Sequence, residues 1–81
     1  MIIVDVYVPL PDTTFDFEAP PECTVGEFTE EVLRILCDIY HSESIAPGEF
    51  VLFAAEQGLP LPRERSLESC GIHSGSRLII T

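Results

Sequence analysis

Two cysteine–histidine pairs are the first groups in this sequence that could do chemistry. Cys37 and His41 are separated by three residues and Cys70 and His73 by two, so the pairs offer the thiol and imidazole ligands that zinc prefers. Cys37 and His41 fall on the polar side of a predicted helix, whereas we expect the loop that carries Cys70 near the other end of that helix. Because zinc ligands must converge tetrahedrally, we predict no metal site and no cofactor.

Cys23 precedes the predicted helix and could approach Cys70 closely enough for a disulfide. The sequence holds three cysteines, none of them in a C-x-x-C pair, and its apolar start lacks the basic region of a signal peptide, so we expect none. This pattern is typical of free thiols in a reducing compartment. We therefore predict three free thiols and a cytoplasmic location.

The remaining polar residues indicate binding rather than catalysis. No nucleophile is accompanied by a base and an orienting group, and the glycines are too scattered to cradle a phosphate. The sequence has 14 acidic residues and 4 basic ones, all arginine, which gives a net charge of −10. Nucleic acid requires a basic footprint, so we predict a protein partner, no nucleic acid and no enzymatic activity.

The elements that position these groups are organised around one helix, predicted over residues 24–41. Thr24 and Glu27 have the spacing of a capping box, in which each side chain accepts a hydrogen bond from the other's backbone N–H. On the polar side, Glu30 and Arg34 have the spacing of a favourable i, i+4 pair. The opposite side is one broad apolar stripe, with Leu33 at its edge, made of Val25, Phe28, Val32, Ile35, Leu36, Ile39 and Tyr40.

Every other apolar run has the alternation or the β-branched content of a strand. We predict strands at 2–8, 14–19, 50–55, 59–62 and 77–81, a turn at 9–13 and a short helical turn at 66–72. The first and last strands are expected to be central and parallel, because the last strand must fill the sheet between the opening hairpin and the third strand. No apolar run approaches the length of a membrane span, so we expect no direct membrane insertion.

The predicted fold class is α+β, with the order ββαββ and the helix packed across a mixed four- to five-stranded sheet. This arrangement is a β-grasp, and the chain is short enough for a single domain of residues 1–81. The predicted core draws on every element and consists of Val4, Val6, Phe15, Phe17, Val25, Phe28, Val32, Leu36, Val51, Phe53, Leu67, Ile72, Leu78 and Ile80.

Three segments carry a resemblance to a known family. Thr24-Val25 at the helix start, Val51-Leu52-Phe53-Ala54, and residues 66–72 followed by Gly75-Ser76-Arg77-Leu78 resemble the layout of ubiquitin. Within that superfamily, the whole chain is similar to small bacterial ubiquitin-like proteins of the YukD/EsaB type, which accompany type VII (WXG-protein) secretion systems. The resemblance implies a ubiquitin-like β-grasp fold.

The resemblance also implies a function. We expect a non-catalytic ubiquitin-like adaptor or accessory component of a type VII secretion system, which binds the cytosolic region of a membrane component and is recruited to the inner face of the membrane. The alternative is an N-terminal cytosolic domain of a larger polytopic secretion protein, for which hydrophobic spans would follow Thr81 in the reading frame. Because the sequence ends without Gly-Gly, we expect neither a conjugated modifier nor a sulfur carrier.

The alternation of the strands also directs large apolar residues away from the helix. In the first strand, alternate side chains point to opposite faces, so we expect Ile3 and Tyr7 to point outward with Asp5. In the third strand we place Val51 and Phe53 inward and Leu52 outward. The corresponding face of ubiquitin is its main docking surface. We therefore predict a protein-binding face that consists of Ile3, Tyr7, Phe50, Leu52 and Ile79.

Overall fold

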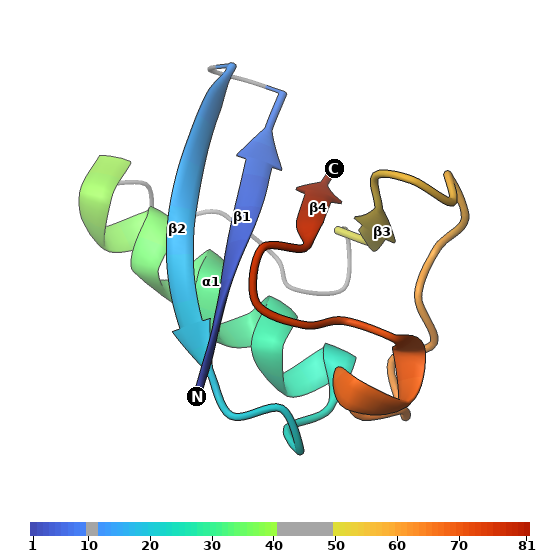
Figure 1. Cartoon of the computed structure of the whole chain (residues 1–81). Coiled ribbons are helices and arrows are strands. Elements are labelled where there is room, and N and C mark those ends of the chain that lie inside the picture. The colour runs from blue at the N-terminus through green and yellow to red at the C-terminus, as the bar shows by residue number, and fades with distance from the viewer. Residues whose placement is uncertain (10–11, 41–49) are drawn as a thin grey trace.

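The computed structural model describes residues 1–9, 12–40 and 50–81. Its elements follow the predicted order (Figure 1): β1 (Ile2–Val8), β2 (Thr13–Ala19), α1 (Val25–Tyr40), β3 (Leu52–Ala54), the short 3₁₀ turn η2 (Glu68–Cys70) and β4 (Arg77–Ile80). The predicted strand at 59–62 is reduced to a single bridge between Pro60 and Phe53. Residues 10 and 11 of the predicted turn, and His41 at the predicted helix end, lie outside the described residues.

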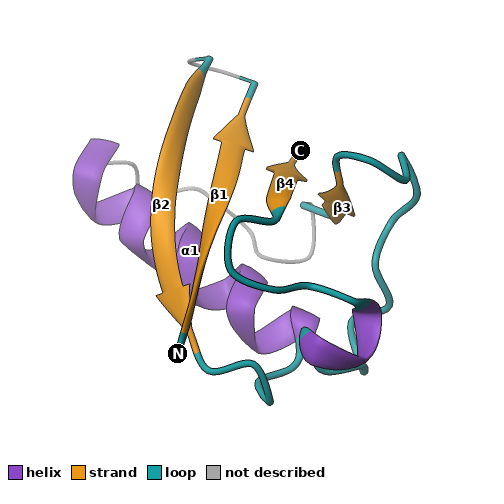
Figure 2. Ribbon diagram, in the orientation of Figure 1, coloured by secondary structure: helices purple, strands orange, loops and turns teal. Residues whose placement is uncertain are grey.

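The sheet has the strand order β2-β1-β4-β3, and α1 crosses one of its faces (Figure 2). β1 pairs with β2 antiparallel and with β4 parallel, and β3 pairs with β4 antiparallel. The prediction of a central parallel pair formed by the first and last strands is therefore confirmed. β2 lies at one edge of the sheet and β3 at the other.

The helix begins where the capping box predicts. The Thr24 backbone N–H donates to Oε1 of Glu27 at 3.0 Å, and the Glu27 N–H donates to Oγ1 of Thr24 at 3.1 Å. The N–H of Gly26 donates to the Arg63 carbonyl at 3.0 Å. A Cβ on residue 26 would lie 3.3 Å from that carbonyl oxygen, so glycine lets the loop after β3 pass close to the first turn. The helix N-terminus is thereby fixed both by its own cap and by this loop.

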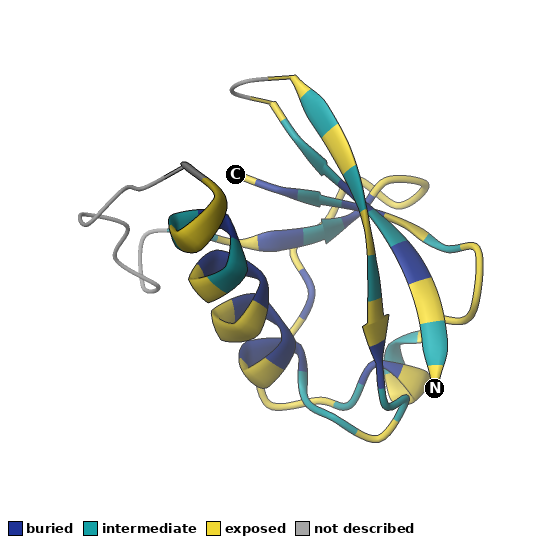
Figure 3. Ribbon diagram, turned by 90° about the vertical axis from the view of Figure 1, so that its left-hand side faces the viewer, coloured by how far each residue is buried: buried dark blue, intermediate teal, exposed yellow. Residues whose placement is uncertain are grey.

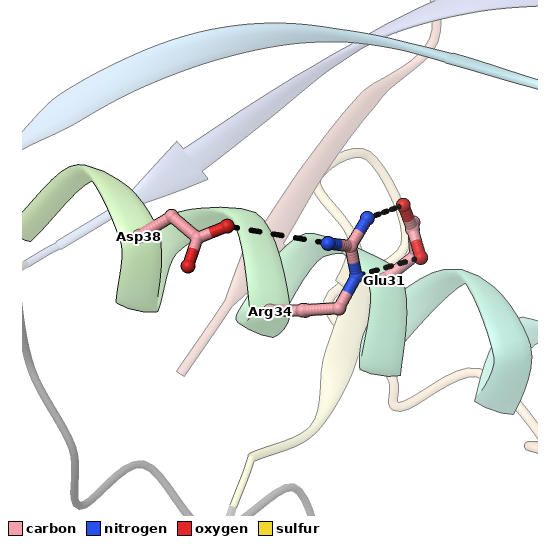
Figure 4. Close-up of polar contacts among 3 residues, drawn as sticks. All are labelled: Glu31, Arg34 and Asp38. Carbon is pink, nitrogen blue, oxygen red and sulfur yellow. Dashed lines mark hydrogen bonds and ion pairs between the residues drawn. The ribbon is translucent and has the colours of Figure 1, made fainter.

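The polar side of α1 carries exposed ion pairs (Figure 4). Nε of Arg34 donates to Oε2 of Glu31 at 3.3 Å, and its Nη1 lies 4.0 Å from Asp38. Glu30, the predicted partner of Arg34, instead lies 3.8 Å from Nη2 of Arg63. Because these side chains are exposed, each pair contributes little to stability.

The core lies between α1 and the inner face of the sheet (Figure 3). Phe28 meets the Phe17 ring edge-on, with the centroids 6.3 Å apart. Phe15 and Phe17 are half-buried and pack against the core. The predicted core residues that are confirmed as buried are Val4, Val6, Val25, Phe28, Val32, Leu36, Leu67, Ile72, Leu78 and Ile80.

The prediction for the third strand is wrong in its parity. Leu52 is 2% exposed and Ala54 is also buried, whereas Val51 is 40% exposed and Phe53 is half-buried. The physical reason is the pairing of Leu52 with Ile80 of β4. Side chains of paired residues point to the same face of a sheet, and Ile80 belongs to the core. Leu52 therefore belongs to the core, whereas Val51 and Phe53 lie on the outer face.

Candidate functional site: the outer face of the sheet

One apolar row crosses the face of the sheet opposite the helix. Tyr7 of β1 is in register with Ile79 of β4, and Ile79 is in register with Phe53 of β3. Residues in register on one face bring their side chains into contact distance. All three are half-buried, so each retains apolar surface that a partner could cover. We call Tyr7, Ile79 and Phe53 the outer row.

A shallow depression of about 410 Å³ adjoins the outer row. It is lined by Asp5, Tyr7, Thr14, Ala55, Arg77, Leu78 and Ile79. Beyond the row, Val51 pairs with Thr81 through two backbone hydrogen bonds of 2.9 and 3.1 Å. On β1, the side chain of Ile3 is 49% exposed. The outer face thus combines a hollow with the half-buried outer row and two exposed apolar residues, Ile3 and Val51.

A charged row runs beside the apolar one. Asp16 of β2 is in register with Asp5 of β1, which is in register with Arg77 of β4. A hydrogen bond with Asp5, and then the negative charge of Asp5, raise the pKa of Asp16. The pair of carboxyl groups makes this side of the outer face acidic, with Arg77 as the neighbouring cation.

At the end of the outer row, the Tyr7 hydroxyl donates a hydrogen bond to Oδ1 of Asp12. This bond raises the pKa of Tyr7. Asp12 has a left-handed backbone with φ of 63°, a conformation that aspartate tolerates better than most residues. This backbone conformation of Asp12 thus accompanies a carboxylate that accepts the hydrogen bond of the Tyr7 hydroxyl.

Three of the five predicted site residues, Ile3, Tyr7 and Ile79, have the outward placement expected for them. Leu52 does not, because it is buried in the core. Phe50 is half-buried and packs against the core. Their places on the face belong to Phe53 and Val51, which sequence parity directed inward. The signal that could have found them is the phase of β4, since Leu78 and Ile80 are inward and fix the phase of the strand paired with them.

Among the described residues, the groups considered for metal or redox chemistry do not gather at one site, and His41 lies outside those residues. Cys23, Cys37 and Cys70 are half-buried free thiols. Nδ1 of His73 lies 2.9 Å from the Ser74 carbonyl oxygen at an exposed turn. Among residues 1–9, 12–40 and 50–81, no group of three or more His, Cys, Asp or Glu side chains could hold a metal ion. Within the same part of the chain, no helix is long and apolar enough to cross a membrane.

Comparison with protein families gives one match. A family model described as protein YukD of the WXG100 protein secretion system (Wss) matches residues 3–80. That range includes the outer row and every helix and strand except the first residue of β1. No curated protein matches the chain.

Solved structures share the fold. The ubiquitin of Caldiarchaeum subterraneum superposes with a TM-score of 0.75 at 20% identity, covering 98% of this chain and 89% of that one. A computationally designed protein based on human erythrocytic ubiquitin gives a TM-score of 0.78 at 26% identity, covering 100% and 90%. ATBAG1, solved in complex with HSP70, gives 0.75 at 15% identity, with 100% of this chain matched to 40% of that one. These likenesses show a ubiquitin-like β-grasp fold.

Proposed function

The chain belongs to the YukD family of the WXG100 secretion system, and from that premise we propose that it acts as a non-catalytic adaptor that binds another protein through its outer row. The proposed partner is the cytosolic region of a membrane component of that secretion system. In this proposal the chain works in the cytoplasm and reaches the inner face of the membrane through its partner.

The observation that carries the proposal is the register of Tyr7, Ile79 and Phe53, which joins three large apolar side chains into one row on a sheet face. In the described part of the chain, α1 lies over the inner face of the sheet, and the outer face carries no such helix (Figure 2). Aromatic and aliphatic groups at the centre of an interface supply most of its binding energy. A polar rim chiefly sets the association rate and its salt dependence. The row of Asp16, Asp5 and Arg77 is suited to that second role.

The experiment is co-purification of the tagged chain with the membrane subunits of its secretion system, followed by titration against the subunit recovered. Phe53→Asp should weaken binding by at least tenfold, or about 1.4 kcal/mol, because it places a charge within the apolar contact, beside Ile79. Ile39→Asp is the matched control, since Ile39 is an exposed apolar residue of α1 away from the outer row. It should bind as the unsubstituted chain does.

Circular dichroism of Phe53→Asp separates loss of binding from loss of fold. If folded Phe53→Asp protein binds its partner normally, the docking surface is not the outer row. The acidic side of α1, with Glu27, Glu31 and Asp38, is then the surface to test, since its carboxylates are exposed.

A further inference from the structure

The edge of the sheet formed by β2 offers a second surface, which differs in chemistry from the outer face. β2 is an edge strand of seven residues, Thr13–Ala19. The other edge, β3, is partly covered, because the Leu61 N–H donates to the Leu52 carbonyl at 2.8 Å and Pro60 bridges Phe53. Figure 3 looks onto the side of the molecule where β2 and α1 lie and shows β2 alternating between exposed and half-buried residues.

The hydrogen-bonding direction of β2 follows from its neighbour β1. The Asp5 N–H donates to the Ser76 carbonyl at 3.0 Å, and the Ile3 carbonyl accepts from Gly75 at 2.9 Å, so the odd-numbered residues of β1 bond toward β4. Its even-numbered residues therefore bond toward β2, where their partners are odd-numbered. The backbone N–H and C=O groups of Thr14, Asp16 and Glu18 consequently point away from the sheet.

A groove with an apolar floor runs along the junction of β2 and α1. Its volume is about 170 Å³, and it is lined by Glu18, Ala19, Pro20, Cys23, Glu27, Phe28 and Glu31. The floor is formed by Phe28, Cys23 and Ala19, which belong to the core or pack against it. The rim carries three glutamates, from β2 and from the first turns of α1. Among the described residues, no strand pairs with β2 on the side away from β1, and this edge lies beside an apolar groove with an acidic rim.

The pKa of the Cys23 thiol reflects the burial and the negative charges around this groove. Burial of the thiol, followed by the negative charges of Glu27 and Glu22, raises this pKa. The burial that disfavours a thiolate favours apolar groups, and the negative charges of Glu27 and Glu22 favour cationic groups at the rim.

From this geometry we infer that the edge of β2 and the adjoining groove bind an extended segment of a partner protein, in which apolar residues alternate with lysine or arginine. The segment adds a strand to the sheet through the outward N–H and C=O groups of Thr14, Asp16 and Glu18. Its alternate side chains point to opposite faces. The apolar ones enter the groove over Phe28 and Cys23, and the basic ones face the carboxylates of Asp16 and Glu18.

Charge selects this occupant over a second copy of the chain. A dimer formed by two β2 edges would bring Asp16 and Glu18 against the same acidic residues of the other copy, and like charges across a strand pair are destabilising. A basic segment makes the opposite pairing and is also attracted by the net charge of −10. This inference does not depend on the outer row, because the groove lies on the helix side of the sheet and the outer row on the opposite face.

The test uses a capped peptide of about nine residues, the length of a long strand, in which lysine alternates with valine. Titration into the ¹⁵N-labelled full chain should slow amide exchange at Thr14, Asp16 and Glu18, whose N–H groups become hydrogen-bonded. Exchange at Phe15 and Phe17, which already bond toward β1, should not change. In the double variant Cys37→Ser/Cys70→Ser, the peptide should also protect Cys23 from alkylation.

Two pairs of variants sharpen the result. Asp16→Pro removes one outward N–H at an edge position where proline is tolerated and should weaken binding about tenfold or more, or 1.4 kcal/mol. Asp16→Asn keeps that N–H and should weaken it less. Glu18→Gln/Glu31→Gln should reduce affinity and its salt dependence. Glu56→Gln/Glu64→Gln changes net charge equally at exposed loop residues that do not line the groove and should have little effect.

Several outcomes would overturn the inference. Equal weakening by the two glutamate double variants would mean attraction to net charge only. Equal binding of the same peptide with glutamate in place of lysine would remove the basic specificity. Shifts confined to Tyr7, Ile79 and Phe53 would assign the peptide to the outer row. Unchanged exchange at Asp16 in the unsubstituted chain would reject strand addition even if Asp16→Pro fails to fold, and concentration-dependent dimerisation through β2 would assign the edge to a second copy.

Discussion

The two faces of the sheet are built from the same strands but hold different kinds of residue. On the inner face, Val4, Val6, Leu78 and Ile80 are at most 1% exposed and form the floor of the core under α1. On the outer face, the outer row is half-buried and stands beside the row of Asp16, Asp5 and Arg77. Neighbours in one strand therefore have opposite roles. Parity decides whether a substitution acts on stability or on binding.

The largest expected effect comes from a charge on the inner face. Leu52→Asp places a carboxylate in a site that is 2% exposed. The free-energy cost of burying an unpaired charge there exceeds the ~5–15 kcal/mol that stabilises a typical domain. We expect no cooperative unfolding transition by circular dichroism. Val51→Asp, one residue away and 40% exposed, should stay folded. A folded Leu52→Asp protein with an ordinary melting curve would mean that Leu52 faces outward.

The second effect concerns the helix side of the same core. Phe28 is 4% exposed, and Phe28→Ala should cost about 3–5 kcal/mol through lost burial and the cavity left behind. Urea unfolding measures this difference directly. A loss below about 1 kcal/mol would show that the ring does not pack in the core.

The helix could be predicted from sequence because its signals are local. Thr24 and Glu27 specify its start, and an apolar stripe at helical spacing specifies its buried side. The third strand offered no such signal. Residues 50–54 are Phe, Val, Leu, Phe and Ala, so either phase buries apolar groups and alternation cannot choose between them. The choice is made by pairing with β4, through contacts such as Leu52 with Ile80 that are distant in sequence.

The candidate site followed the same rule. Tyr7 and Ile3 were predicted correctly as outward because Asp5 between them marks the polar phase of β1. Phe53 was missed because no charged residue marks the phase of β3. The alternation of β2 was also predicted, but its position at the edge depends on the order of the strands, which is a property of the whole fold.

A smaller and more direct test uses two adjacent isoleucines of β4. Ile80 is buried and Ile79 is half-buried on the outer face. Threonine is β-branched like isoleucine and suits a strand equally well, so the substitution changes mainly polarity and volume. Ile80→Thr should cost about 2 kcal/mol by placing a hydroxyl in the core, and Ile79→Thr less than about 1 kcal/mol. If urea unfolding gives equal losses of unfolding free energy for the two variants, Ile80 and Ile79 do not lie on a buried and an outer face.

The smallest expected effects are pH-dependent and have opposite signs at two exposed carboxyl groups. Hydrogen bonds from the backbone N–H and the hydroxyl of Thr24 lower the pKa of Glu27 below its ordinary 4.5. Its stabilisation is therefore present above that value and is lost as pH falls through the lower folded pKa. Asp16 behaves oppositely, because Asp5 raises its pKa above the ordinary 3.8. Its charge destabilises the fold at neutral pH, and that penalty disappears as pH falls through the raised folded pKa.

Two conservative variants separate these contributions. Glu27→Gln should be less stable than the unsubstituted chain at neutral pH, because it weakens the helix cap. Asp16→Asn should be more stable there, because it removes repulsion on the outer face. Each difference should shrink as pH is lowered through the folded pKa of the carboxyl concerned, first for Asp16 and then for Glu27. Urea midpoints measured across that range give the sign of each. If Glu27→Gln stabilises the chain at neutral pH, the Glu27 carboxylate does not hold the start of the helix. If Asp16→Asn destabilises it there, the pair of Asp16 and Asp5 is favourable beside Arg77 rather than repulsive.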